Sequence, residues 1–204
     1  MVLKYLKDPR FKLVDDPKAA KILYLTVDYE SKVFADWEVD YSTTYVTFFS
    51  KEAALVVKSS LASLINATLA DTSCIQQTFD LESQLPQFVG CFQDRAKKGQ
   101  ENTWIIKPAS MARSIDTWVT NNCEQIVRLV ETGPKIAQKY IDRPLTFQGR
   151  KIDLRYVVLL KSLFPLQLYL TTEFYIRFSN NQFTMAESTF SEYETHFTVM
   201  NYGE

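Results

Sequence analysis

The 204-residue sequence predicts an α+β fold, in which a small α/β unit over residues 1–100 precedes a largely antiparallel sheet with helices over residues 101–204. Two observations predict it. Segments with helical spacing of apolar residues dominate the first half, beside one compact apolar run. From about residue 102 short β-like runs dominate, and a single amphipathic helix interrupts them.

The first half contains one expected strand and two expected helices. Lys21–Val27 is a compact apolar run suited to a buried strand, and Asp15-Asp16-Pro17 before it indicates a turn or a helix start. Lys51–Ile65 places apolar residues at spacings compatible with one helical face. Leu81–Phe92 repeats that spacing, with Pro86 suited to a first turn. The expected stripe of this second helix is Leu85, Phe88, Val89 and Phe92.

The second half alternates strands with one helix. A helix is expected over Cys123–Val130, capped by Thr120, Asn121 or Asn122 and ended by Gly133-Pro134. The last two strands read as a pair joined around Ser162–Pro165, and both are apolar on more than one face, as in a sheet that is covered on both sides. The expected strands are Thr103–Lys107, Lys135–Ile141, Lys151–Leu160 and Leu166–Phe178.

Composition narrows the class of protein. With 46% hydrophobic and 23% charged residues, the chain has the profile of a folded soluble domain. Its net charge of −1 provides no overall attraction to nucleic acid or to an anionic membrane, so direct binding to either is not expected. No apolar run reaches the length of a membrane span. The three cysteines form no CxxC pair, which favours reduced thiols in a cytoplasmic or nuclear protein.

Three short motifs carry candidate chemistry. In Trp104-Ile105-Ile106-Lys107-Pro108 an apolar strand ends in a lysine, which can present a point charge to a phosphate or can be a solvated edge residue. In Gln138-Lys139-Tyr140-Ile141 a strand runs into Asp142-Arg143-Pro144, where backbone groups can pair with an adenine edge and Ile141 can pack on the ring. A plain strand end is the alternative interpretation of that motif.

The third motif, Lys151-Ile152-Asp153-Leu154-Arg155, is the most informative feature of the chain. Strand alternation places Lys151, Asp153 and Arg155 on one face of an otherwise apolar strand. Charges there are costly if buried unless they pair or hold a ligand. Two cations beside one carboxylate suit a nucleotide phosphate or acyl-phosphate site, and a mutually paired surface stripe is the alternative.

Taken in order, WIIKP, QKYIDRP and KIDLR resemble the ATP-grasp core of the tubulin–tyrosine ligase-like family, and the resemblance continues through YVVLLKSLFPLQLYLTTEFYIRFSN to HFTVMNY. The resemblance is close over residues 79–202 and weaker over residues 1–78. One subgroup of the family is favoured by the stretches LESQLPQFVGCF, NTWIIKP and MARSIDT. The resemblance implies ATP and magnesium as cofactors. It assigns Lys107, Gln138, Lys139, Ile141, Lys151 and Asp153 to nucleotide binding, and Arg155 and Arg177 to the catalytic site. Lys58 matches an upstream phosphate-contacting lysine only weakly, and an unliganded helix-face lysine is equally compatible.

Departures from the family pattern bear on activity. Ala109–Asp116 contains no glycine where active members carry a glycine-rich phosphate loop, although Ser110, Arg113 and Ser114 offer side-chain contacts. Val199 stands where the family's HLTN-like element has asparagine. The family's magnesium ligands come from later strands, and the acids at Glu187, Glu192, Glu194 and Glu204 form no recognisable replacement, so the metal ligands are expected outside this chain. His196, the only histidine, has no visible nucleophile partner and reads as structural.

Two functions from different classes follow from the resemblance. The first is an ATP-dependent carboxylate–amine ligase that adds an amino acid to tubulin. The second is a non-catalytic pseudo-ligase that regulates tubulin or chromatin modification, which the missing glycines and metal ligands favour for this chain. Tubulin or microtubules are the expected partners, with chromatin proteins as a further class. A blander alternative is an α/β interaction module without a nucleotide site.

Overall fold

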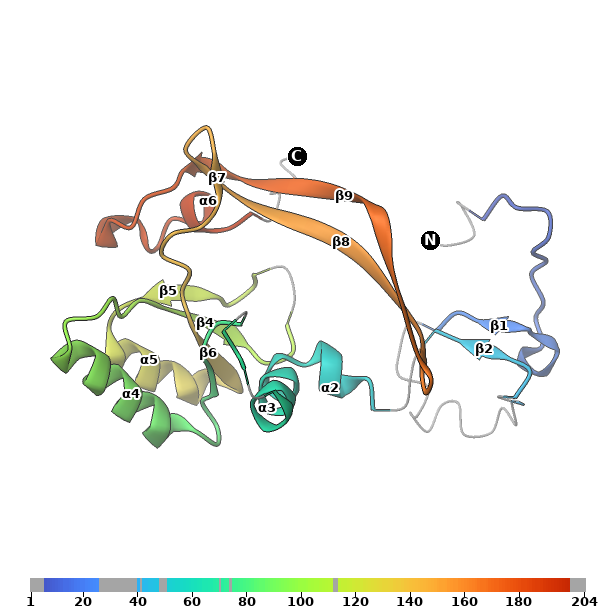
Figure 1. The fold of residues 1–204 in the computed structure, drawn as a ribbon, viewed down its shortest axis with the longest axis horizontal. Coiled ribbons are helices and arrows are strands. Elements are labelled where there is room, and N and C mark those ends of the chain that lie inside the picture. Colours follow the sequence, from blue (N-terminus) through green and yellow to red (C-terminus); the bar gives the residue numbers. More distant parts are fainter. Residues whose placement is uncertain are drawn as a thin grey trace. The chain divides into compact units, whose positions relative to one another are not determined.

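The computed structural model describes residues 6–25, 40, 42–47, 51–69, 71–73, 75–111 and 114–198. The chain divides into two compact units, Met1–Ala54 and Leu55–Glu204. Figure 1 traces both along the sequence. No helix of the described residues has the length and apolarity required to cross a membrane.

In the first unit, the short 3₁₀ helix η1 (Pro17–Ala19) begins after Asp16, whose side chain accepts a hydrogen bond from the backbone N–H of Lys18. Strand β1 (Ile22–Leu23) pairs in parallel with β2 (Tyr45–Val46). The expected buried strand over 21–27 is wrong in burial and extent: Ile22 is 51% exposed, the strand has two residues, and residues 26 and 27 lie outside the described part. A two-residue partner covers too little apolar surface to bury the run.

The helix expected over residues 51–65 is two helices, α2 (Ala53–Val56) and α3 (Lys58–Thr68). Val57 between them has extended backbone angles. The N–H of Lys58 donates to the carbonyl of Ala109, 3.1 Å away, so it is not part of a continuous helical ladder. A tertiary hydrogen bond therefore divides a segment whose apolar spacing suggests one helix.

The second unit is built around a four-stranded antiparallel sheet with the order β3-β6-β4-β5. Helices α4 (Leu85–Lys97) and α5 (Cys123–Leu129), the latter followed by η3 (Val130–Thr132), lie together beside this sheet (Figure 1). Asn122 is the observed cap of α5, because its side chain accepts from the N–H of Gln125 at 3.1 Å. The four strands are β3 (Thr78–Asp80), β4 (Trp104–Pro108), β5 (Trp118–Thr120) and β6 (Lys135–Lys139).

One face of this sheet forms the hydrophobic core. Alternation along β4 buries Trp104 and Ile106 completely, and Phe88 of α4 packs edge-on against the Trp104 indole with ring centroids 5.1 Å apart. The other expected stripe residues of α4 pack against the same cluster. Because alternate residues of β4 face the helices, Ile105 and Lys107 point to the opposite face. The fully buried residues of the core are Leu81, Phe88, Trp104, Ile106, Ile126 and Ala137.

A second antiparallel sheet consists mainly of one long hairpin, β8 (Arg150–Leu163) and β9 (Leu166–Gln182), with the short strand β7 (Thr146–Phe147) paired to β8. The chain reverses at Phe164-Pro165, within the expected turn. After β9 come η4 (Glu187–Thr189) and α6 (Tyr193–His196), and α6 packs on β9. The prediction of an α+β fold with largely antiparallel strands is confirmed.

The outer part of the hairpin is exposed on both faces. Val158 and Leu159 are neighbours in a regularly paired stretch of β8, so their side chains point to opposite faces, yet they are 53% and 62% exposed. Leu159 and Tyr169 face each other across the strands and are also exposed. Within the described residues the outer hairpin therefore carries exposed apolar side chains on both faces, which form a contiguous apolar surface.

We expect the 204-residue chain to associate in solution through this apolar surface, because soluble monomers rarely tolerate a patch of this kind. Light scattering coupled to sizing chromatography should show a mass that rises with protein concentration. The double substitution Leu159→Lys with Tyr169→Glu keeps a favourable cross-strand pair and should reduce that rise. A monodisperse monomer with slow amide hydrogen exchange along residues 154–170 would contradict the expectation.

Candidate functional site

A pocket of about 500 Å³ opens on the face of β4 that is opposite the core. Its size is that of small-molecule sites in proteins. Side chains from the start of α3, from β4, from the segment after β6 and from the base of the hairpin contribute to it. We call it the lysine pocket, and the lining residues with candidate roles are Lys58, Lys107, Ile141, Lys151, Asp153 and Arg177.

Lys107 reaches the pocket from the end of β4, where alternation directs it away from the core. Its ammonium donates to Gln138 Oε1 at 2.7 Å, and the Gln138 amide in turn donates to Thr78 Oγ1 at 3.0 Å. Burial and, to a smaller extent, the charge of Lys58 together lower the pKa of Lys107 to about 8. A half-buried ammonium bonded to a neutral amide lacks the counterion that usually stabilises it.

Lys58 is the first residue of α3, and its side chain reaches the end of β4. Its ammonium donates to the carbonyl oxygens of Pro108 at 3.1 Å and Met111 at 2.6 Å. Burial lowers the pKa of Lys58. Lys58 thus ties α3 to the segment after β4 and brings a second positive charge close to Lys107.

Lys151 approaches from β8, on the other side of the pocket. Its ammonium donates to Tyr140 Oη and to the carbonyl of His196, both at 3.1 Å, and lies 4.6 Å from the centre of the Tyr140 ring. Burial lowers the pKa of Lys151 to about 8; the charge of Lys107 adds to this effect and that of Asp153 opposes it. All three lysines therefore direct their hydrogen bonds to neutral acceptors.

Asp153 supplies the carboxylate of the pocket, but its oxygens are already engaged. Arg177, directly opposite on β9, donates from Nε to Oδ1 at 2.7 Å and from Nη2 to Oδ2, and Thr198 also donates to Oδ2. Burial alone would raise the pKa of Asp153, yet these hydrogen bonds hold it below its usual value. The pair joins the two strands of the hairpin at its base.

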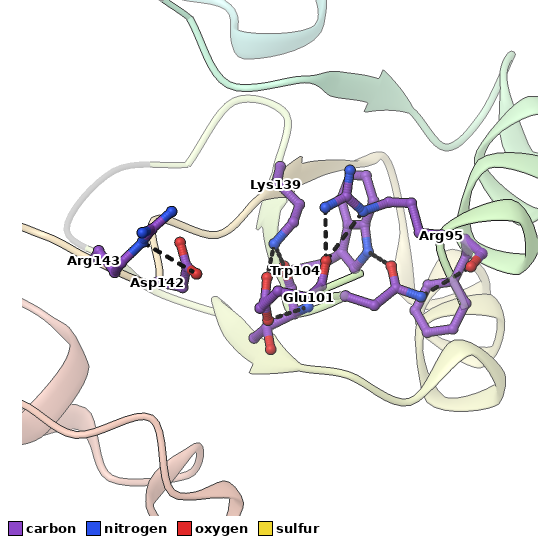
Figure 2. Close-up of polar contacts among 9 residues, drawn as sticks. Arg95, Glu101, Trp104, Lys139, Asp142 and Arg143 are labelled. Carbon is purple, nitrogen blue, oxygen red and sulfur yellow. Dashed lines mark hydrogen bonds and ion pairs between the residues drawn. The ribbon is translucent and has the colours of Figure 1, made fainter. Parts of the chain in front are cut away.

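Three of the predicted site residues do not line the lysine pocket, and one of them, Gln138, contacts it only through its hydrogen bond with Lys107. Lys139 donates to the Glu101 carboxylate and, at 2.9 Å, to the carbonyl of Thr103, on the face of the sheet to which Trp104 of β4 also points (Figure 2). Strand alternation separates it from Gln138, which contacts Lys107. Arg155 is exposed on β8 and does not line the lysine pocket, although its charge contributes to the low pKa of Asp153.

The glycine-free segment after β4 adopts left-handed backbone conformations without glycine. Ser114 and Asp116 have φ values of 56° and 51°. Such angles are unfavourable for most residues and are tolerated best by short polar side chains. The Asp116 carboxylate accepts from the buried Lys135 ammonium and, at 3.2 Å, from the Trp118 indole, which stabilises this conformation. Arg113 lies outside the described residues.

Tyr140 and His196 are site residues that the motif-based prediction did not include. Tyr140 is 4% exposed and His196 is 1% exposed, and the Tyr140 hydroxyl lies 2.9 Å from His196 Nδ1. Alternation along β6 places Tyr140 on the face of Gln138, so the strand pattern contained a signal for Tyr140. Sequence spacing contained no such signal for His196, because 56 residues separate it from Tyr140.

Within the described residues, no group of three or more histidine, cysteine, aspartate or glutamate side chains could hold a metal ion. The acids Glu187, Glu192 and Glu194 do not line the lysine pocket, and Glu204 lies outside the described part of the chain. Val199 is also outside it.

Comparison with known proteins gives a consistent assignment. Residues 38–204 match the model of the tubulin-tyrosine ligase family. The chain is 38% identical to tubulin–tyrosine ligase-like protein 12 of Caenorhabditis elegans and 38% identical to the human protein of that name, over 98% of its own length in both cases. It is 32% identical to tubulin glycylase 3E of Tetrahymena thermophila over 50% of its length. The chain spans 30% and 32% of the two first-named relatives.

The lowered pKa values of Lys107 and Lys151 predict how stability depends on pH. Because their folded pKa of about 8 lies below the unfolded value of about 10.4, the unfolded chain binds more protons between these limits, and the free energy of unfolding should rise from pH 8 to pH 10. Lys107→Met should reduce that rise by on the order of 1 kcal/mol in urea titrations at both pH values. Lys98→Met, at an exposed lysine of α4's end, is the control. Equal pH dependence in all three chains would contradict the assignment.

Proposed function

The chain belongs to the tubulin–tyrosine ligase family, and from this premise we propose that its lysine pocket binds the phosphates of ATP in a protein that acts on tubulin or regulates tubulin modification. The observation that carries the proposal is the convergence of three ammonium groups, each bonded to neutral acceptors, in a pocket of about 500 Å³. Such a site is incomplete until an anion enters it.

The residues present fit a nucleotide. Lys58, Lys107 and Lys151 would hold phosphate oxygens, whose negative charge would stabilise ammonium groups that burial otherwise disfavours. Ile141 lines the same pocket just after β6 and offers an apolar surface for the base. Arg143 adds a further cation at the pocket lining. The pocket therefore concentrates positive charge in a chain whose net charge is −1.

When bound, ATP would supply the phosphoryl group that activates a substrate carboxylate for attack by an amine. The chain's own contribution is to bind the phosphates and to balance their charge with lysines that are already held in place. Arg177 would act by fixing Asp153, since its two hydrogen bonds engage both carboxylate oxygens. Arg155, an exposed cation on β8 beside the site, would be available to a substrate that approaches from the hairpin.

A non-catalytic regulator of tubulin or chromatin modification is the second candidate, and one observation favours it. Asp153, the carboxylate of the lysine pocket, is engaged by Arg177 and Thr198, and a ligand cation would have to compete with both. A regulator would keep nucleotide binding and lose turnover. For either candidate we propose tubulin or microtubules as partner, chromatin proteins as a further partner for the regulator, and a cytoplasmic location that extends to the nucleus.

We expect the 204-residue chain to bind ATP in the absence of magnesium, and Lys107→Met and Lys151→Met each to weaken this binding about 10- to 100-fold, because each removes a charge-assisted hydrogen bond. Calorimetric titration at pH 7 measures the affinity. Lys139→Met is the matched control, since Lys139 contacts Glu101 and lies outside the pocket. Affinity unchanged in both pocket variants, or no binding by the parent chain, would refute the proposal.

A second measurement separates the ligase from the regulator. We expect residues 1–204 alone to give little or no ATP-dependent incorporation of radiolabelled tyrosine, glutamate or glycine into tubulin, because the described residues contain no metal-binding cluster. Activity that depends on Lys107 would overturn this expectation and establish the chain as a ligase. ATP binding without incorporation would agree with it.

A further inference from the structure

Behind Lys151 a row of hydrogen-bonding groups crosses from β6 to the segment after β9. Tyr140 Oη lies 2.9 Å from His196 Nδ1, and His196 Nε2 lies 3.1 Å from Thr189 Oγ1. Thr189 Oγ1 donates to the carbonyl of Ala186 at 2.7 Å. The rings of Tyr140, Phe183 and Phe190 surround the imidazole at centroid distances of 5.7–5.8 Å. Both ring nitrogens of a buried histidine are therefore bonded to hydroxyl groups.

The hydrogen bonds in this row can be assigned a direction. The Thr189 hydroxyl donates its only proton to the carbonyl of Ala186, so toward His196 it can act only as an acceptor. The imidazole proton is therefore on Nε2. Nδ1 is then an acceptor, and the Tyr140 hydroxyl must donate to it. The free lone pair of Tyr140 accepts from the Lys151 ammonium. The row runs from Lys151 through Tyr140, His196 and Thr189 to Ala186, and the two hydroxyl groups and the imidazole N–H each donate once.

This direction matters for Lys151. A hydroxyl that donates to an imidazole becomes a better acceptor, because linked hydrogen bonds polarise one another. The carbonyl of His196 supplies the second acceptor for the same ammonium. An ammonium has three N–H donors, so one remains for a ligand in the lysine pocket. Tyr140 and His196, which are distant in sequence, thus fix the position of the Lys151 ammonium and leave one of its N–H groups available to a ligand.

We propose that Tyr140 and His196 are positioning residues of the lysine pocket: their directed hydrogen bonds hold the Lys151 ammonium in place for an anionic ligand. This role rests on the proposed function. Because His196 and Thr189 belong to the segment that follows β9, Lys151 is held correctly only when that segment is packed against β6 and the hairpin. The pocket is therefore completed by α6, which Figure 1 shows beside β9.

The test uses the 204-residue chain and two readouts. Tyr140→Phe keeps the ring under the ammonium and removes the hydroxyl that links Lys151 to His196. We expect this variant to bind ATP and inorganic triphosphate about tenfold more weakly, since one polarised hydrogen bond to the ammonium is lost. In ¹³C NMR of chains labelled at the lysine ε carbon, with Lys151→Arg used to assign the signal, we expect the Lys151 pKa to fall. Tyr169→Phe, an exposed hairpin tyrosine, is the matched control.

Thr189→Val is the second variant, because it removes the hydroxyl that accepts from the imidazole, keeps the backbone of Thr189 that also hydrogen-bonds His196, and leaves Tyr140 and Lys151 intact. It should shift the Lys151 pKa in the same direction by less, and it decides the outcome if Tyr140→Phe fails to fold by circular dichroism. An unchanged Lys151 pKa in the folded variants would overturn the inference even where the parent chain binds triphosphate. A shifted Lys151 pKa with no triphosphate binding by the parent would support the hydrogen-bonded row and refute the proposed function.

Discussion

The antiparallel pairing of β4 with β6 is the constraint on which the rest of the second unit depends. This pairing places Trp104 opposite Lys139 and Ile105 opposite Gln138. Because the helices bury the face that carries Trp104 and Ile106, the residues between them must face the other way. Lys107 and Gln138 lie on the same face of the sheet for this reason, where Gln138 accepts a hydrogen bond from this lysine of the pocket. A slip of one residue in that register would exchange the core with the pocket.

The pocket is unusual in the way its charges are compensated. Elsewhere in the unit a buried lysine has a carboxylate partner: Lys135 pairs with Asp116, and Lys139 pairs with Glu101. In the pocket Lys107 and Lys151 are bonded to an amide, a phenol and a backbone carbonyl, and burial lowers the pKa of both. Buried ammonium groups without counterions are destabilising, and such groups cluster where a ligand completes the site. This contrast within the second unit separates structural lysines from candidate ligand-binding ones.

The β8–β9 hairpin supplies one side of the lysine pocket at its base and carries the exposed apolar surface farther out. At its base, Asp153 and Arg177 join β8 to β9, and Lys151 reaches the pocket from the same strand. Farther out, the same two strands carry apolar side chains that remain exposed on both faces. The base is thus stabilised by packing and ion pairing, whereas the outer part relies on ladder hydrogen bonds between two strands, which alone are marginally stable in water. The two strands can therefore be stably paired at the pocket while their outer part opens more readily.

Strand alternation and short local motifs by themselves determined the α+β class, the α4 and α5 helices, the hairpin and the candidate roles of Lys107, Lys151 and Asp153. These features depend on residues that are near one another in the chain, where periods of 2 and 3.6 residues decide which side chain faces the core. The break at Val57, the placement of Lys139 on the core face and the contact of Tyr140 with His196 were decided by tertiary structure. Each depends on a partner supplied by a distant segment: Ala109 for Lys58, Glu101 for Lys139 and the chain after β9 for Tyr140. Local sequence contains no information about such partners, because hydrogen bonds and burial between distant segments form only when the chain has folded.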